Sequence, residues 1–361
     1  MRLGEPFTIY ANPAPLLLSR QAAFPGLVSL GGGELLAMFS IGQAFDAADM
    51  RSHTCRSRDG GRTWSAPVPM HGGTALESES FKPVRLPDGR LLATGYVFER
   101  PDMVTPIVDP ATRRILPLVT KAAWSSDDGA TWSVPRPFDA DAPLELSGPA
   151  LVTSDGRLLA AGAPFHLGTE GHEGWLIESR DGGGSWQRLS VFYRSPGGRV
   201  APWECRLAEL GPGRIAVLFW AYDTAADRNL DNHLVLSEDG GQSFGPALAT
   251  GIMGQASNLM PLNLTPPGES EILTIHCHRA PPVSLTLRRL ALTGEVREEA
   301  DIFTAEAMGA ATGNISAQFG SLKFGQPSLT RLSQTEALAA WWQVEDCQHV
   351  IKGARIELGS A

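Results

Sequence analysis

Carboxylates, an arginine and aromatic rings recur in this sequence at or near the ends of short apolar runs. Asp49 lies in IGQAFDAADM, Glu204 in WECRLAEL and Arg279 in HCHRAPP. Trp220 and Tyr222 end the run IAVLFWAY. Aromatic rings stack on the face of a pyranose, and ionisable groups orient a sugar and transfer protons. If the fold brings these segments together, they can form a site that binds or cleaves a carbohydrate.

A repeated eight-residue string indicates the elements that would bring them together. The pattern S-x-D-x-G-x-[ST]-[WF] occurs as SRDGGRTW at 57–64, SSDDGATW at 125–132, SRDGGGSW at 179–186 and SEDGGQSF at 237–244. Its aspartates, Asp59, Asp127, Asp181 and Asp239, are 68, 54 and 58 residues apart. Such a period is long enough for one four-stranded sheet and a variable loop, and fixed periods of this kind are typical of repeat architectures.

Each string follows a second repeated feature, a Gly-rich turn that leads into an apolar run. The examples are GGGELLAMF at 31–39, LPDGRLLATG at 86–95, SDGRLLAAG at 154–162 and GPGRIAVLF at 211–219. An apolar stretch also precedes each turn, so the pair is typical of a β-hairpin. Two later segments, 258–292 and 327–358, keep this rhythm without the string. The sequence therefore predicts six blades of four antiparallel strands, an all-β propeller.

The last of the six units shows only three strands. We expect a strand within residues 5–18 to supply the fourth and so to close the ring, because closure removes exposed sheet edges. The whole chain, residues 1–361, is then expected to be one propeller domain.

The aspartate of the string has a structural explanation. Its carboxylate can accept hydrogen bonds from backbone N–H groups of its own turn, the following glycine tolerates a positive φ, and the aromatic residue packs between sheets. Four equivalent catalytic groups would point to four separate places. We therefore predict that Asp59, Asp127, Asp181 and Asp239 are structural.

Composition restricts the possible partners. The net charge of −9 argues against broad attraction to nucleic acid or to an anionic membrane. No segment has the roughly 18 consecutive apolar residues of a membrane span, and the N-terminus lacks the apolar core of a signal peptide. We expect a cytoplasmic protein, with a periplasmic one as the alternative. Histidines and cysteines show no metal-ligand spacing, so neither a metal nor another cofactor is expected. The oligomeric state is left open.

The four strings look like Asp-boxes, also called BNR repeats, and in a six-bladed pattern they resemble the sialidase (neuraminidase) superfamily. The resemblance in repeat layout extends over essentially the whole chain and implies the propeller fold. For activity it implies a site with three arginines for the sugar carboxylate, an aspartate as acid/base, and a tyrosine nucleophile activated by a glutamate.

Three positions match that set. The aspartate of the first blade's long loop corresponds to Asp49, with Asp46 as the alternative. Glu204, in WECRLAELGPGR, matches the glutamate that opens the fourth blade, and Arg279 matches the third arginine.

Other positions depart from the set. Where the first arginine is expected the sequence reads AAFPGLV, and the place of the second holds FWAYD, with Trp220 and Tyr222. Gln326 stands where the nucleophilic tyrosine would open the sixth blade. A covalent intermediate on that tyrosine is therefore not supported.

Strand order also predicts where a site lies, because the start of each innermost strand and the end of the next share one face of a blade. The positions selected in this way as substrate-binding residues are Lys82, His166, Arg206, Trp220, Arg279 and Gln326.

We expect a sialidase-like glycoside hydrolase acting on a small acidic sugar at the centre of the ring. Asp49 would protonate the leaving oxygen, Glu204 would act as base toward water or through Tyr222, and Arg279 with Lys82 would hold an acidic substituent. One alternative is a uronate lyase with His166 or Tyr222 as base and Arg279 neutralising the carboxylate. Another is a non-catalytic carbohydrate-binding propeller.

Overall fold

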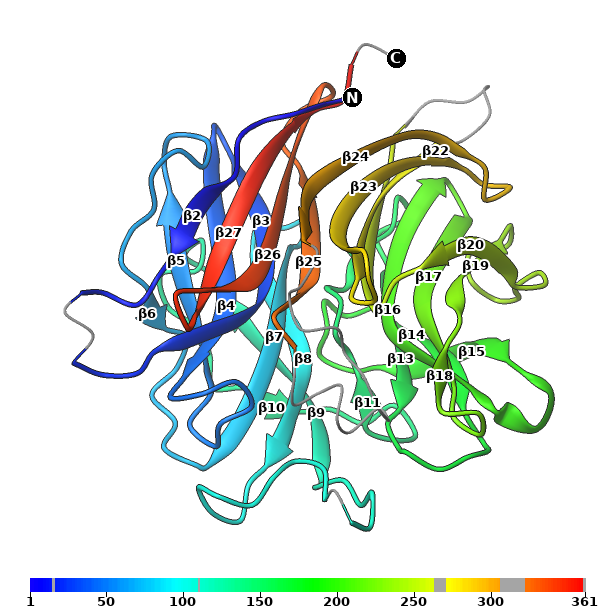
Figure 1. The fold of residues 1–361 in the computed structure, drawn as a ribbon, viewed down its shortest axis with the longest axis horizontal. Helices are drawn as coiled ribbons and strands as arrows, with labels where there is room; N and C mark the ends of the chain where they lie inside the picture. The colour runs from blue at the N-terminus through cyan, green and yellow to red at the C-terminus, as the bar shows by residue number, and fades with distance from the viewer. Residues whose placement is uncertain (15–16, 110, 263–270, 306–321, 360–361) are drawn as a thin grey trace.

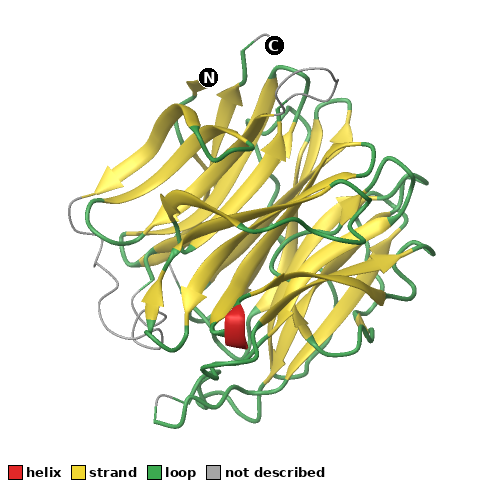
Figure 2. Cartoon of the chain, turned by 90° about the vertical axis from the view of Figure 1, so that its right-hand side faces the viewer, coloured by secondary structure: helices red, strands yellow, loops and turns green. Residues whose placement is uncertain are grey.

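The computed structural model describes residues 1–14, 17–109, 111–262, 271–305 and 322–359. They form six antiparallel sheets that follow one another in chain order around a ring (Figure 1). Within this part of the chain the one helix is the 3-10 turn η1, Pro196–Gly198 (Figure 2). The predicted all-β, six-bladed propeller is confirmed. That residues 1–361 form one domain stays a prediction.

The first three sheets come from the first half of the chain, each ordered from the innermost strand outward. Blade one contains β3 (Gln21–Gly31), β4 (Glu34–Gly42), β5 (Arg51–Ser57) and β6 (Val68–Pro69). Blade two contains β7 (Glu77–Arg85), β8 (Leu91–Glu99), β9 (Leu118–Ser125) and β10 (Arg136–Pro137). In blade three the innermost strand is split into β11 (Leu144–Glu145) and β12 (Leu151–Val152), followed by β13 (Leu158–Pro164), β14 (Glu173–Ser179) and β15 (Gln187–Arg194).

The second half of the chain forms the other three sheets. Blade four contains β16 (Val200–Gly211), β17 (Arg214–Asp223), β19 (Asp231–Ser237) and β20 (Leu248–Met253), and the short β18 (Arg228–Asn229) pairs with β17. Blade five contains β21 (Ala256–Pro261), β22 (Glu271–His278), β23 (Val283–Ala291) and β24 (Val296–Ala305). Blade six contains β25 (Phe324–Arg331), β26 (Glu336–Glu345) and β27 (Gln348–Glu357).

The N-terminal segment completes blade six. Strand β2 (Phe7–Tyr10) pairs antiparallel with β27, which confirms the closing strand predicted within residues 5–18. Strand β1 (Arg2–Leu3) also pairs with β27, closer to the terminus than expected. The two ends of the chain consequently lie together, as Figure 1 shows.

Apolar runs form the middle strands because these strands are covered on both faces. In β17 every residue from Ile215 to Tyr222 is buried. A continuous apolar run of this kind, without alternation, fits a strand packed between two neighbouring sheets. The hydrophobic clusters of the propeller lie between neighbouring blades; one joins Leu92 of blade two to Ile177 of blade three.

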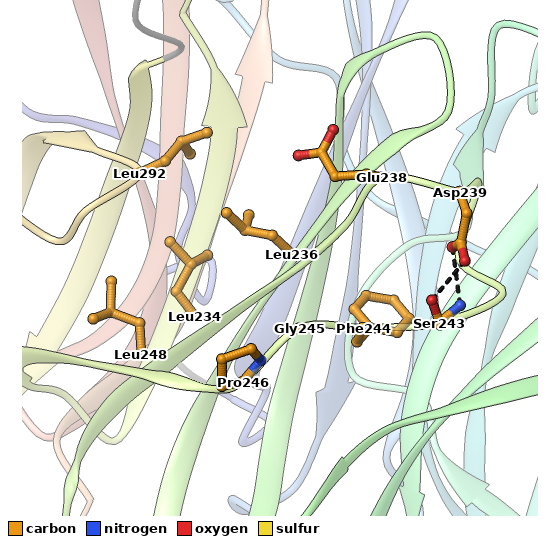
Figure 3. A pocket seen from close by; sticks show the side chains of 10 residues that line it. All are labelled: Leu234, Leu236, Glu238, Asp239, Ser243, Phe244, Gly245, Pro246, Leu248 and Leu292. Atoms are coloured by element: carbon orange, nitrogen blue, oxygen red, sulfur yellow. Dashed lines mark hydrogen bonds between the residues drawn. The ribbon is translucent and has the colours of Figure 1, made fainter.

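The turns after the third strands share one hydrogen-bond pattern. In blade three, Asp181 Oδ1 accepts a hydrogen bond from the backbone N–H of Ser185 at 2.9 Å and one from the hydroxyl of Ser179 at 2.8 Å. The Ser185 hydroxyl donates to Asp181 Oδ2 at 2.6 Å. Trp186 packs in the cluster between blades two and three. The equivalent bonds recur at Asp59, Asp127 and Asp239, and Figure 3 shows Asp239 bonded to Ser243.

Replacing Asp181 by alanine should lower the free energy of unfolding by about 2 kcal/mol. The variant loses the charge-assisted hydrogen bonds from the Ser179 hydroxyl and from the backbone N–H and hydroxyl of Ser185. These bonds lower the pKa of Asp181 to about 2. A depressed carboxyl pKa stabilises the fold above the ordinary value near 4, and the gain disappears as the pH falls toward 2. Urea unfolding at pH 7 and pH 2.5 measures both effects.

Arg180→Ala, in the same turn and largely exposed, is the matched control and should change stability by less than about 0.5 kcal/mol. An equal loss in both variants at pH 7 would contradict the structural role.

Candidate functional site

A cavity of about 570 Å³ lies at the centre of the ring, and all six blades contribute to its walls. The walls are rich in aromatic side chains and also hold carboxyl groups. The lining includes Phe24, Phe45 and Asp46 from blade one, Tyr96 from blade two, Glu145 and Phe165 from blade three, Trp203, Glu204 and Trp220 from blade four, Arg279 from blade five, and Gln326, Trp342 and His349 from blade six.

Three of the innermost strands present their residues to the cavity through the same irregularity. Phe24, Glu204 and Gln326 have φ values of 61°, 52° and 36°, in the left-handed region. In each strand the register with the next strand shifts at this point. A bulge of this kind re-aims a side chain, and positive φ in such residues stores strain. The fold therefore places these three side chains in the cavity at an energetic cost.

Glu204 is held firmly among polar partners. Its Oε2 accepts a hydrogen bond from Arg206 Nη2 at 3.0 Å, and its Oε1 accepts one from Gln326 Nε2 at 2.6 Å. Arg206, which is only 2% exposed, also donates to Ser147 Oγ and to a backbone carbonyl. An arginine and an amide thus stabilise an ionised carboxylate at Glu204. Arg206 does not line the cavity, so it positions Glu204 rather than meeting a ligand.

A second glutamate, Glu145, lies beside Glu204. It is 5% exposed, and its Oε2 accepts a hydrogen bond from the Glu204 backbone N–H at 3.3 Å. Burial and the neighbouring Glu204 raise the pKa of Glu145 well above its ordinary value. The sequence analysis did not select it. The same strand-start rule would have found it in LELSGP if the split innermost strand of blade three had been recognised.

Of the two aspartates in the first blade's loop, Asp46 lines the cavity and Asp49 does not. The Asp49 carboxylate accepts a hydrogen bond from the backbone N–H of Gln43 at 3.1 Å, within its own loop. Burial raises the pKa of Asp46 to about 6, and Arg100 acts in the opposite direction. The alternative, Asp46, is therefore the residue that the fold brings to Glu204 and Arg279.

Arg279 lines the cavity and is 7% exposed. Its Nε and Nη2 donate to the backbone carbonyl of Phe324 at 3.1 and 2.8 Å, and its backbone N–H donates to Gln255 Oε1 at 3.0 Å. Within the described residues it forms no ion pair with a carboxylate and no hydrogen bond through Nη1. A buried cation without a counterion favours an anionic ligand.

Lys82 lies behind the cavity wall rather than in it. It is 2% exposed, and its Nζ donates to Ser80 Oγ at 3.0 Å. Burial, followed by the nearby Arg206, lowers the pKa of Lys82 to about 7. Lys82 therefore contributes charge to the region of Glu204 and Glu145 without direct access to a ligand.

The aromatic residues of blade four divide between the cavity and the core. Trp203 and Trp220 line the cavity, and Trp220 Nε1 donates to Asn229 Oδ1 at 2.8 Å. Tyr222 is fully buried, stacks against Trp203 with ring centres 5.0 Å apart, and donates its hydroxyl to Asp227 Oδ1 at 2.6 Å. The structure therefore does not place the phenol of Tyr222 against a ligand or as a relay to Glu204.

His166 is likewise outside the cavity lining. Its ring stacks on His172 with centres 4.0 Å apart, and its Nδ1 accepts a hydrogen bond from the backbone N–H of Gly168 at 3.2 Å. The adjacent Phe165 reaches the cavity instead. His349, which the sequence analysis did not select, lines it and stacks on Phe45.

Within the described residues, three buried polar atoms of cavity-lining side chains have no hydrogen-bond partner. They are Trp203 Nε1, Trp342 Nε1 and Gln326 Oε1. Buried polar atoms are rarely left in this state.

A second cavity, of about 530 Å³, lies at the outer part of blade four, away from these residues. Leucines and Phe244 form much of its lining, as Figure 3 shows. Its two carboxylates are Glu238, paired with Arg214, and Asp239, bonded within its own turn. It has no cation that would hold an acidic sugar, so the central cavity is the candidate site.

In the described part of the chain, no cluster of three or more His, Cys, Asp or Glu side chains could hold a metal ion. None of the described helices has the length and hydropathy needed to span a membrane.

No protein-family model and no curated protein sequence matches the chain. Solved structures do. A Dyadobacter fermentans protein of unknown function is 19% identical over 99% of both chains, with a TM-score of 0.76. The NanB sialidase of Streptococcus pneumoniae is 12% identical over 98% of this chain and 70% of its own, with a TM-score of 0.68. The Hadza microbial sialidase Hz136 is 16% identical over 94% of this chain and 66% of its own, with a TM-score of 0.67. The chain therefore has a sialidase-like β-propeller fold, and at these identities the likeness establishes the fold alone.

Proposed function

We propose that the protein hydrolyses glycosides of a small acidic sugar in the central cavity. One observation carries this proposal: Arg279, a buried arginine that forms no ion pair with a carboxylate among the described residues, shares the cavity with the carboxyl groups of Asp46 and Glu204 and with stacking rings. The arginine supplies binding of an acidic substituent, and two carboxyl groups are what glycoside hydrolysis requires. The sialidase names of structural neighbours agree with a carbohydrate substrate.

Asp46 takes the role that the sequence analysis gave to Asp49. Burial raises the pKa of Asp46 to about 6, so near neutral pH part of the protein holds a proton there, as a general acid requires. It would protonate the leaving oxygen. Glu204, whose carboxylate accepts hydrogen bonds from Arg206 and Gln326, would act directly as base toward water. Tyr222 has no part in this scheme because its hydroxyl is bonded to Asp227.

The uronate lyase receives no support from these positions. Its proposed bases, His166 and Tyr222, both lie outside the cavity lining. A purely carbohydrate-binding role would not require two carboxyl groups, Asp46 and Glu204, in one cavity, and we therefore favour hydrolysis.

Asp46→Asn should lower kcat on unactivated glycosides about 10- to 100-fold, whereas Asp49→Asn should change it less than about threefold. The two aspartates lie in the same loop, so the pair is a matched comparison of a carboxyl inside the cavity with one outside it. The measurement is a screen of chromogenic sialosides and glucuronides, followed by kinetics on an oligosaccharide with the same sugar. If no glycoside of an acidic sugar is cleaved by the wild-type protein, the proposed function is wrong. A larger loss in Asp49→Asn would return the acid role to Asp49.

A further inference from the structure

The two neighbouring glutamates of the cavity have unequal environments. Glu204 has an arginine and an amide as hydrogen-bond donors. Glu145, by contrast, forms no ion pair with any lysine, arginine or histidine in the described residues. The charge of Arg206 acts on Glu145, but its guanidinium is bonded to Glu204, Ser147 and a carbonyl. A buried carboxyl group that lies beside another carboxyl group and has no ion-pair partner favours its neutral form.

Glu145 is also placed to meet a ligand. It lines the cavity together with Glu204 and Arg279, and it is 95% buried. A protonated carboxyl has one O–H donor, which an ionised carboxylate lacks. Apart from the exposed Lys323, Arg279 is the one cation of the lining, so a neutral donor in the same cavity would be a further contact for an anionic oxygen.

We propose that Glu145 binds the acidic sugar as a neutral carboxylic acid, donating a hydrogen bond to an anionic oxygen of the sugar. This inference rests on the acidic substrate of the proposed function and adds the group that recognises it. It makes binding depend on the proton of Glu145 rather than only on the charge of Arg279.

The direction of the pH dependence follows. As the pH rises through the raised pKa of Glu145, the donor is lost and a second negative charge appears beside Glu204. Affinity for an anionic sugar should then fall by up to about tenfold per pH unit. The pH dependence caused by Glu145 must be distinguished from that of the other titratable and charged groups around it. From β7, β8 and β16 these are Lys82, Tyr96, Glu204, Cys205 and Arg206. Of these, Lys82, with a pKa lowered to about 7, loses its positive charge as the pH rises. Asp46, in the lining of the same cavity and with a pKa raised to about 6, gains a negative charge. Both changes also weaken binding of an anion.

The experiment measures binding of glucuronate and of N-acetylneuraminate by tryptophan fluorescence between about pH 5 and pH 9, with glucose as the neutral comparison. Three tryptophans of the cavity wall, Trp203, Trp220 and Trp342, give the signal. The variants are Glu145→Gln, whose amide keeps an N–H donor at every pH, and Glu145→Ala, which has none. Lys82→Met and Asp46→Asn remove the two other groups that titrate in this range, and each should retain the decrease that Glu145 causes.

Glu145→Gln should bind the acid sugar within about threefold of wild type at low pH and should lose much of the alkaline decrease. Glu145→Ala should bind weakly throughout, and Lys82→Met should retain the decrease. The inference is overturned if Glu145→Gln shows the wild-type pH profile, if folded Glu145→Gln fails to bind at any pH, or if neither acid sugar binds the wild-type protein. If the binding results are as expected but no glycoside is cleaved, the proposed hydrolysis fails and this inference stands.

Discussion

Glu204→Gln is expected to lower kcat on the acidic glycoside by about 10³- to 10⁴-fold. The Glu204 carboxylate accepts hydrogen bonds from Arg206 at 3.0 Å and from Gln326 at 2.6 Å, which fix its position in the cavity. An amide of the same shape can still bond one of these partners but cannot accept a proton from water. Steady-state kinetics on the substrate found in the screen give the loss directly.

Loss of stability could be mistaken for loss of catalysis in Glu204→Gln, because Glu204 is the carboxylate partner of the buried Arg206. Removing the carboxylate partner of a buried cation destabilises a protein by about 3–5 kcal/mol, so thermal unfolding must accompany the kinetics. Glu209→Gln is the matched control: it lies in the same strand, β16, and bonds Ser154 at the surface, and its kcat should stay within about threefold of wild type. Azide should restore part of the turnover of Glu204→Ala, because azide attacks without a base. A folded Glu204→Gln protein with near wild-type kcat would contradict the role of Glu204 as the base.

The fold was predictable because its signal is repeated and local. The string around Asp59, Asp127, Asp181 and Asp239 forms the same turn four times, and each turn needs its serine, aspartate and glycine for hydrogen bonds made within a few residues. Such bonds can be inferred from sequence, since no distant partner is involved. The string identifies four blades, and the hairpin rhythm of two further segments gives six. The closing strand was predicted because the last of these units shows only three strands.

The site was only partly predictable because its side chains are aimed by irregular backbone. The loop between β4 and β5 contains two successive turns. The backbone N–H of Ala47 donates to the carbonyl of Ala44, and the backbone N–H of Met50 donates to the carbonyl of Ala47. Asp46 and Asp49 therefore point to different places. Counting residues from the string cannot resolve this. In blade four, Trp203 covers Tyr222, a contact set by the register of β16 against β17. Arg279, by contrast, was found because it directly follows strand β22. Glu204, at a bulge within β16, was found because WECRLAELGPGR matches the motif that opens the fourth blade.

The other large effect is expected at Arg279. Arg279→Met should lower kcat/KM for glycosides of an acidic sugar by about 100- to 1000-fold, since losing a buried charge-assisted contact costs about 3–4 kcal/mol at about 1.4 kcal/mol per tenfold. Hydrolysis or binding of a neutral sugar should change far less. The ratio of acidic to neutral substrate therefore separates loss of the charge from general damage to the site.

Arg279 also has a structural task, and the controls must account for it. Its guanidinium bonds the carbonyl of Phe324, so the methionine variant also leaves that carbonyl without a donor. Arg331 bonds the carbonyls of Pro261 and Leu262 outside the cavity, and Arg331→Met therefore measures the cost of losing carbonyl contacts alone. Arg279→Lys keeps the charge but not the planar pair of donors, and it should fall between wild type and Arg279→Met. Equal losses on acidic and neutral substrates in Arg279→Met would mean that Arg279 holds the cavity wall rather than the substrate's anionic group.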